Sequence, residues 1–100
     1  MAEQLSWERE GSTLVLAGEL DGDTVHSLWQ ERAQAMVGVQ AFSLAKLTRV
    51  DTAGLALLIH LVALVRKQGG EPVLQGASDK LQTLVKLYNL PDGLLPAFAS

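Results

Sequence analysis

The feature that most constrains this chain is an apolar segment from Ala53 to Val65 that a single polar residue interrupts. Asp51 and Thr52 precede it and Gly69-Gly70 follow it, and these residue types commonly begin and end helices. The segment has about 13 residues, well short of the roughly 20 that a bilayer-spanning helix needs. The pattern therefore predicts a long central helix from Thr52 to Gln68 that packs on other parts of the protein.

The predicted central helix has two unlike faces when it is drawn at about 100° per residue. One half carries leucine and valine and should pack on a sheet: Leu55, Leu58, Leu61, Val62 and Val65, with Leu57 and Leu64 beside them. The opposite arc combines small residues with one β-branched apolar group and two polar tips: Thr52, Ala56, Ile59, His60, Ala63 and Lys67. Small side chains let another surface approach the helix backbone, so this arc is a candidate protein interface. The alternative is that alanine serves only helix formation and that solvent covers the arc.

Thr52 lies where the central helix begins, and two roles are open to it. As the N-cap, its hydroxyl would satisfy a free backbone N–H, which is worth about 1 kcal/mol. If Asp51 is the cap instead, Thr52 is free to contact a partner. A phosphate on Thr52 would also be well placed, because helix N-termini favour anions. Gly54 costs helix stability, so its value should be bare backbone beside a loop or a close approach by a partner.

The rest of the chain alternates strands with helices. We expect strands at Leu5–Glu8, Thr13–Ala17, Ala41–Ala45 and Pro72–Gln75, a loop at Gly18–Gly22, and an apolar tail of Leu94, Leu95 and Phe98. The first helix should begin at Asp23 or Thr24 and run to about Met36 before Gly38, and the third should run from Ser78 to Tyr88 before Asn89-Leu90-Pro91. The order β-β-α-β-α-β-α predicts an α/β fold in which helices pack on a mixed sheet of about four strands. Right-handed crossovers would place the helices on one face if the strands advance in one direction.

The two flanking helices have predicted core faces. The first helix would bury Val25, Leu28, Arg32 and Met36, and the third would bury Leu81, Leu84, Val85 and Tyr88. Trp29 lies at the rim of the first of these faces. It either packs in the core or anchors an interface, since tryptophan is enriched in binding hot spots. Because the first and central helices should be neighbours, Trp29 and Thr52 could share one surface.

Composition and motif spacing weigh against several functions. One hundred residues suit a single domain over residues 1–100, and the net charge of -3 is scattered, so we expect no nucleic-acid partner. The chain has no cysteine, and His26 and His60 lack ligand spacing, so we expect neither thiol chemistry nor a metal. The glycines match no phosphate loop, and no base and orienting group complete a threonine nucleophile. We therefore expect no catalytic residue and no cofactor. Without a signal-peptide core at the N-terminus, we expect a soluble intracellular protein.

The run Asp51-Thr52-Ala53-Gly54-Leu55 at the start of the central helix, together with the element order, resembles the STAS domain family. That family carries Asp-Ser-Ser/Thr-Gly-Leu at this point, and its first hydroxyl residue is a phosphorylation or docking position. Thr52 matches that position, whereas Ala53 replaces the second hydroxyl. Further segments resemble the small STAS subunits of the Mla phospholipid-transport systems of Gram-negative bacteria: Gly18-Glu19-Leu20-Asp21, Leu28-Trp29, Arg49-Val50-Asp51-Thr52, Gly54 to Leu58, Lys67-Gln68-Gly69 and Lys86-Leu87-Tyr88-Asn89-Leu90-Pro91.

The resemblance implies a non-catalytic cytoplasmic subunit that is peripheral to the inner membrane only through its complex. Its partner would be an ABC ATPase (MlaF-like), whose assembly and activity it would support. The ATPase would lie beneath a permease (MlaE-like), and the complex would work with an MlaD-like protein. The contact residues would be Trp29, Asp51, Thr52, Ala56, Ile59, His60 and Ala63. The alternative is an anti-sigma-factor antagonist that phosphorylation of Thr52 regulates, although Ala53 weighs against it. A third interpretation, a small-ligand-binding STAS domain, lacks a polar cluster that would define a pocket.

Overall fold

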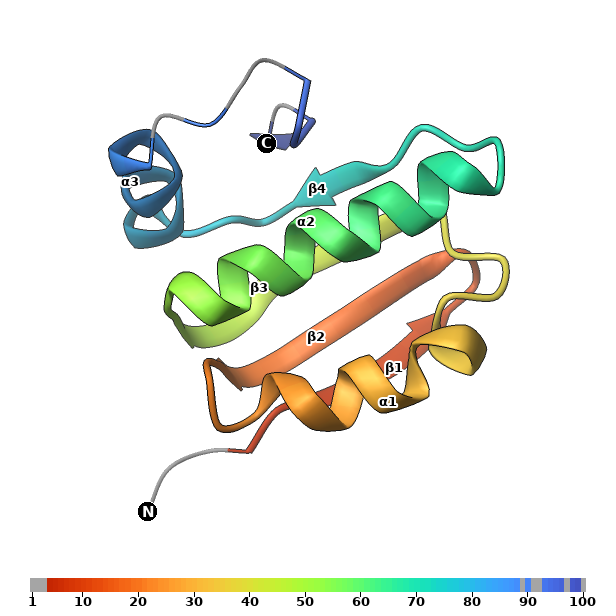
Figure 1. Cartoon of the computed structure of the whole chain (residues 1–100), viewed down its shortest axis with the longest axis horizontal. Coiled ribbons are helices and arrows are strands. Elements are labelled where there is room, and N and C mark those ends of the chain that lie inside the picture. The colour runs from red at the N-terminus through yellow and green to blue at the C-terminus, as the bar shows by residue number, and fades with distance from the viewer. Residues whose placement is uncertain (1–3, 89, 91–92, 97, 100) are drawn as a thin grey trace.

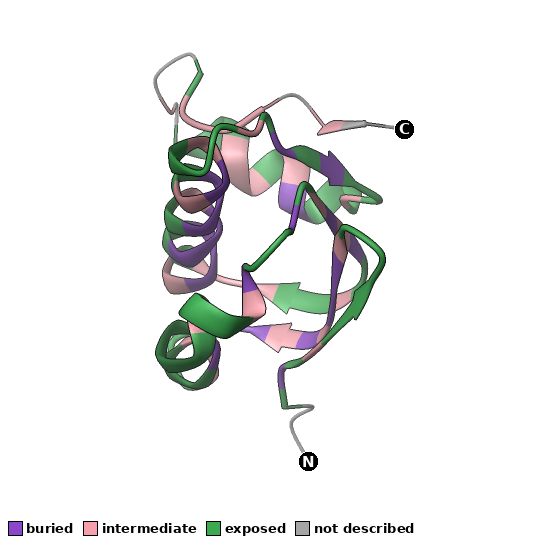
Figure 2. Cartoon of the chain, turned by 90° about the vertical axis from the view of Figure 1, so that its right-hand side faces the viewer, coloured by how far each residue is buried: buried purple, intermediate pink, exposed green. Residues whose placement is uncertain are grey.

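The computed structural model of the chain describes residues 4–88, 90, 93–96 and 98–99, which form one five-stranded sheet with helices beside it. The elements in chain order are β1 (Ser6–Glu10), β2 (Thr13–Leu20), α1 (Val25–Ala35), β3 (Ala41–Val50), α2 (Thr52–Lys67), β4 (Val73–Gln75), α3 (Asp79–Leu87) and β5 (Phe98–Ala99). Figure 1 shows α1 and α2 side by side across the sheet, and the turned view in Figure 2 places both on the same side of the strands. The predicted fold class is confirmed.

The sheet is mixed, and its strands stand in the order of the chain. β1 is antiparallel to β2, whereas β3, β4 and β5 continue from β2 in parallel. Its register aligns a row of large apolar side chains across four strands: Leu14, Phe42, Leu74 and Phe98. Leu14, Phe42 and Leu74 are buried and belong to the core that the sheet shares with the buried side of α2. This row explains why strands of quite different lengths hold together.

β2 and β3 are longer than the sequence predicts. β2 continues to Leu20, so the expected loop at Gly18–Gly22 begins three residues later, and β3 continues to Val50. The register between the two strands shifts near Gly18, whose φ is +89°. A Cβ atom at that position would lie only 2.3 Å from the carbonyl oxygen of Gln4. Gly18 therefore lets β2 bulge and continue where the sequence suggested that it ends.

The C-terminal part follows the predictions only in part. Ser78 caps α3 as predicted, because its Oγ accepts a hydrogen bond of 3.1 Å from the backbone N–H of Leu81. The predicted burial of Tyr88 is wrong, since Tyr88 follows the last residue of α3 and is 49% exposed. Phe98 pairs with Leu74 in a two-residue strand that the sequence did not predict. The predicted stop at residues 89–91 lies largely outside the described residues.

α1 packs by the face that its periodicity indicates. Leu28 and Met36 are fully buried, and Val25 and Arg32 are half-buried. The helix ends at Ala35, and Gly38 follows it with a φ of +73°, a conformation that favours glycine. Among the described residues, no helix is both long enough and apolar enough to cross a membrane.

Candidate functional site

The start of α2 is held by Asp51, which settles the choice between the two possible caps. Asp51 has an extended backbone, and its Oδ1 accepts a hydrogen bond of 3.0 Å from the N–H of Gly54. Thr52 is then the first helical residue and is exposed. Thr52 is therefore not the N-cap, and the residue is exposed at the surface.

Gly54 is buried against the end of β2. A Cβ atom at Gly54 would lie 2.1 Å from the carbonyl oxygen of Leu20, so only glycine fits without a shift of the backbone. The sequence left open whether Gly54 makes room for a partner or for another part of the chain. The structure shows that the group closest to Gly54 is the backbone of Leu20 in the same chain. The contact brings the beginning of α2 directly against the end of β2, and it fixes where Thr52 emerges.

The two faces of α2 differ in burial as the helical wheel predicts. The buried residues are Gly54, Leu55, Leu57, Leu58, Leu61, Val62 and Val65. On the opposite arc Thr52, Ala56, His60, Ala63 and Lys67 are exposed, and Ile59 is half-buried. We call Thr52, Ala56, Ile59, His60, Ala63 and Lys67 the α2 arc. Its surface is mainly small and uncharged, whereas the solvent side of a helix usually carries charged and polar residues.

Trp29 joins α1 to the α2 arc. Its ring lies 5.4 Å from the ring of His60 between centroids, and the two planes are inclined at 60°. On the same indole, the guanidinium carbon of Arg32 lies 3.9 Å from the ring centroid, within the range of a cation–π contact. Trp29 is 36% exposed, so its ring is held on two sides while part of it faces outward. The structure thus places Trp29 against His60, which lies two helical turns beyond Thr52.

The loop before α1 is organised by a buried carboxylate that sequence reasoning missed. Asp21 Oδ1 accepts hydrogen bonds from the N–H groups of Asp23 and Thr24, at 3.0 and 3.2 Å. We predicted that Asp23 or Thr24 would cap α1. Thr24 does occupy the N-cap position, but its side chain makes no capping bond there. It instead accepts from the Asp21 N–H and donates to the Glu19 carbonyl, because Asp21 already serves the loop.

The charge state of Asp21 follows from these contacts. Burial by itself raises the pKa of a carboxyl group. For Asp21 the hydrogen bonds from the backbone N–H groups of Asp23 and Thr24 outweigh burial, so its pKa lies below the ordinary value. A guanidinium nitrogen of Arg49 in β3 lies 4.0 Å from Asp21 Oδ2. The carboxylate therefore stays ionised and fixes the turn that leads into α1.

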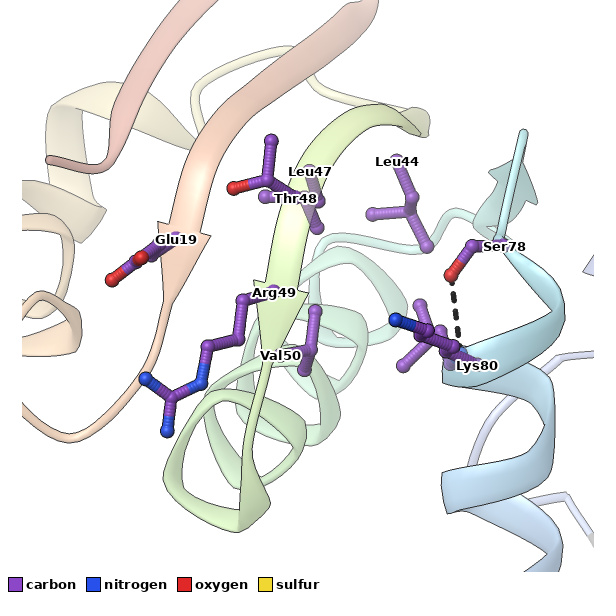
Figure 3. A pocket seen from close by; sticks show the side chains of 9 residues that line it. Glu19, Leu44, Leu47, Thr48, Arg49, Val50, Ser78 and Lys80 are labelled. Carbon is purple, nitrogen blue, oxygen red and sulfur yellow. Dashed lines mark hydrogen bonds between the residues drawn. The ribbon is translucent and has the colours of Figure 1, made fainter. Parts of the chain in front are cut away.

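A hollow of about 470 Å³ lies between the end of β3 and the beginning of α3, a feature that our sequence reasoning did not anticipate. Its lining mixes apolar and polar side chains: Glu19, Leu44, Leu47, Thr48, Arg49, Val50, Ser78, Lys80 and Leu81. Figure 3 shows Lys80 reaching from α3 toward β3, whereas Arg49 extends away from α3. The hollow lies near the carboxyl end of a parallel strand, which is where α/β sheets often bind ligands.

The described residues hold no candidate metal site. Among them no group of three or more His, Cys, Asp or Glu side chains is arranged to hold a metal ion. Asp51, which is adjacent to Thr52 in sequence, directs both carboxylate oxygens to backbone N–H groups, those of Gly54 and Gly22. The arrangement around Thr52 is therefore one that presents a surface and fixes its shape.

Comparisons with known proteins agree with this geometry. Residues 3–96 match the family described as "Mlab, STAS domain". The intermembrane phospholipid transport system binding proteins MlaB of Escherichia coli K12 and Shigella flexneri are each 52% identical over 96 residues, which cover 96% of this chain and 99% of theirs.

Solved structures show the same fold at much lower sequence identity. The anti-sigma-factor antagonist SpoIIAA in its unphosphorylated form superposes with a TM-score of 0.63 at 19% identity, over 83% of this chain and 82% of its own. The phosphorylated form from Bacillus gives 0.65 at 19% identity, over 96% and 91%. A Thermotoga maritima protein gives 0.70 at 16% identity, over 96% and 86%.

Proposed function

This chain belongs to the MlaB family of STAS domains, and on that premise we propose that it docks on the ABC ATPase of a phospholipid transport system through the α2 arc and Trp29. It is a non-catalytic binding protein of an intermembrane phospholipid transport system. The proposed contact residues are Trp29, Asp51, Thr52, Ala56, Ile59, His60 and Ala63. We propose that the chain is cytoplasmic and reaches the inner membrane only through the ATPase, an MlaE-like permease and an MlaD-like protein.

One observation carries the proposal: α2 buries its leucine face and presents a nearly uncharged arc of small residues with an ordered aromatic at its side. Alanine at positions 56 and 63 leaves the helix backbone within reach of a partner. The Trp29 ring, held by His60 and Arg32, supplies the large side chain that typically contributes most of the binding energy. A helix exposed only to water would gain more from charged residues on this side.

The proposed mechanism is a shift in the conformations of the ATPase. A protein without catalytic groups changes the activity of its partner only if it binds one of the partner's conformations better than another. Docking of the α2 arc on a single conformation would raise the population of that conformation and support assembly of the complex. The proposal needs no lipid contact and no chemistry on this chain.

The test compares two identical substitutions on exposed helical threonines. Thr52→Lys adds bulk and an unpaired charge to the α2 arc, whereas Thr83→Lys adds them to α3, away from the arc. Titration calorimetry with the purified ATPase should show at least a tenfold loss of affinity for Thr52→Lys, since stranding a charge in a contact costs several kcal/mol. Thr83→Lys and the conservative Thr52→Ser should bind nearly as the wild type does. Wild-type affinity in Thr52→Lys would refute the assignment of the surface.

The alternative function, an anti-sigma-factor antagonist regulated by phosphorylation, remains a prediction. The exposure of Thr52 at a helix N-terminus is the observation in its favour. Intact-mass measurement of the chain from native cells discriminates between the two. Stoichiometric phosphate on Thr52 would support the regulatory role, and an unmodified mass together with recovery of the ATPase would support the transport role.

A further inference from the structure

Asp51 uses its two carboxylate oxygens for different purposes. Oδ1 accepts from the N–H of Gly54 and caps α2, at 3.0 Å. Oδ2 accepts from the N–H of Gly22 at 3.2 Å, and Gly22 lies 29 residues earlier in the loop between β2 and α1. A helix cap requires only one oxygen. The second bond, which we call the Asp51–Gly22 link, therefore does something other than begin the helix.

Hydrogen bonds join the loop around Gly22 to the start of α1. Asp21 holds the backbone N–H groups of the two residues that follow Gly22, and its own carbonyl accepts from the N–H groups of Thr24 and Val25. The hydroxyl of Thr24 adds bonds back to Asp21 and Glu19. A displacement of Gly22 would therefore carry the first residues of α1 with it. Fixing Gly22 to Asp51 amounts to fixing the start of α1 to the start of α2.

The two helices meet a second time through Trp29 and His60. His60 lies eight residues beyond Thr52, which is about 12 Å along α2 at about 1.5 Å per residue. α1 is thus fastened to α2 at two levels, by a hydrogen bond where the helices begin and by an aromatic contact further along. The proposed docking surface takes Trp29 from one helix and Thr52 from the other, so its shape depends on this alignment.

We propose that Asp51 is a positioning residue whose Oδ2, through the Asp51–Gly22 link, sets α1 relative to α2 and so presents Trp29 and Thr52 together to the partner. This inference rests on the proposed function for the identity of the partner. Its physical content is preorganisation: a surface that is already aligned loses less conformational freedom when it binds. Asp51 would then act on affinity through the shape of the surface as well as through any contact of its own.

Asp51→Asn separates the two uses of the side chain. Asparagine caps helices as well as aspartate does, so its oxygen can still accept from Gly54. Its other terminal atom is an NH2 group, which cannot accept from the Gly22 N–H. Asp51→Ser provides one oxygen for the cap and no second acceptor, so the two variants should agree. Gln82→Ala is the matched control, because it removes a side-chain hydrogen bond to the Ala77 carbonyl near α3, away from the proposed surface.

The experiment has four readouts on the full chain. They are the affinity for the ATPase, the melting temperature, the amide exchange rate of Gly22 by NMR, and the chemical shifts of the His60 ring. We expect Asp51→Asn and Asp51→Ser to speed Gly22 exchange, to move the His60 shifts, and to weaken binding by about 3- to 10-fold, the worth of one hydrogen bond. Gln82→Ala should lower the melting temperature about as much as the two Asp51 variants do. It should leave the His60 chemical shifts and the affinity for the ATPase unchanged.

Each unfavourable outcome has a distinct meaning. Gly22 exchange at the wild-type rate in Asp51→Asn would show that the link does not exist in solution and would overturn the inference. Faster exchange with unchanged affinity would also overturn it, because alignment would then not matter for docking. If the wild-type chain does not bind the ATPase, the proposed function and the positioning role for that partner are both refuted. The Gly22 exchange rate and the His60 chemical shifts would still decide whether the Asp51–Gly22 link aligns the helices.

Discussion

The rings of Trp29 and His60 meet across the boundary between α1 and α2, with their centroids 5.4 Å apart and their planes inclined at 60°. Aromatic pairs favour such tilted arrangements, because the edge of one ring meets the face of the other. The contact restrains a side chain that remains 36% exposed. A tryptophan that is ordered before binding is well suited to anchor a partner, since little of its freedom remains to be lost.

Trp29→Ala should weaken binding to the ATPase by about 30-fold or more, the scale of a hot-spot residue. Because Trp29 is partly exposed, the free energy of unfolding should change much less than it would for a buried aromatic. Titration calorimetry and urea unfolding measure the two effects. Val37→Ala, which truncates an exposed apolar side chain beyond the end of α1, is the control. If Trp29→Ala bound within about twofold of wild type, a change of only about 0.4 kcal/mol in binding free energy, Trp29 would not be an anchor.

Gly54→Ala tests the contact between α2 and β2 through the sign of its effect. Helix propensity alone would make this change stabilising by about 1 kcal/mol. The structure predicts the opposite, because the added Cβ would lie 2.1 Å from the Leu20 carbonyl oxygen. We expect a loss of about 1–3 kcal/mol in the free energy of unfolding, the usual cost of overpacking. Ala63→Gly, on the exposed side of α2, calibrates the propensity effect by urea unfolding. A stabilised Gly54→Ala would show that the contact is looser than described.

Asp21 should make stability depend on pH in the acidic range. Its pKa is lowered in the folded protein, so its ionised form contributes stability above the unfolded pKa, and that contribution is lost as pH falls through the folded value. The unfolded value is about 3.9, so the loss begins near pH 5 and continues downward. Asp21→Asn should therefore be less stable than wild type at pH 7, and the gap should narrow toward pH 3 in urea unfolding. The exposed Glu31→Gln is the control, and a gap that is constant with pH would exclude this linkage.

Ser78→Ala should destabilise α3 by about 1 kcal/mol, because the Leu81 N–H loses its capping acceptor. Ser78→Asp should retain the cap and nearly all of the stability. Thr83→Ala, at an exposed position inside the same helix, should have little effect. Amide exchange of Leu81 gives the local measurement, and an unchanged rate in Ser78→Ala would argue against the cap.

Sequence alone was sufficient for α2, because its length, its periodicity and the residue types at its ends all agree. The residue that caps α2 could not be predicted from the sequence in the same way. Asp51 and Thr52 are both good caps, and only the extended backbone of Asp51 decides between them. The α2 arc was predicted residue by residue and is exposed except for the half-buried Ile59. Exposure alone does not test the partner, and the contacts with the ATPase stay predictions.

Other features escaped sequence reasoning for physical reasons. The role of Asp21 was missed, although aspartate two residues before a free N–H is a known turn pattern that could have indicated it. Tyr88 was placed in the core by periodicity, but the helix ends before it, and a periodic pattern does not say where a short helix stops. The hollow beside Lys80 depends on how far α3 stands from β3, which no local pattern encodes.

The chain order of the strands has a consequence for how this protein is built. Every strand pairs only with the strands that come immediately before and after it in the chain, so the sheet can grow at one edge. Each new strand must close only the loop that contains one intervening turn or helix, and the entropic cost of such a closure grows only slowly with loop length. No strand has to be inserted between two that are already paired. This sheet can therefore assemble progressively, one strand after another, as the chain leaves the ribosome.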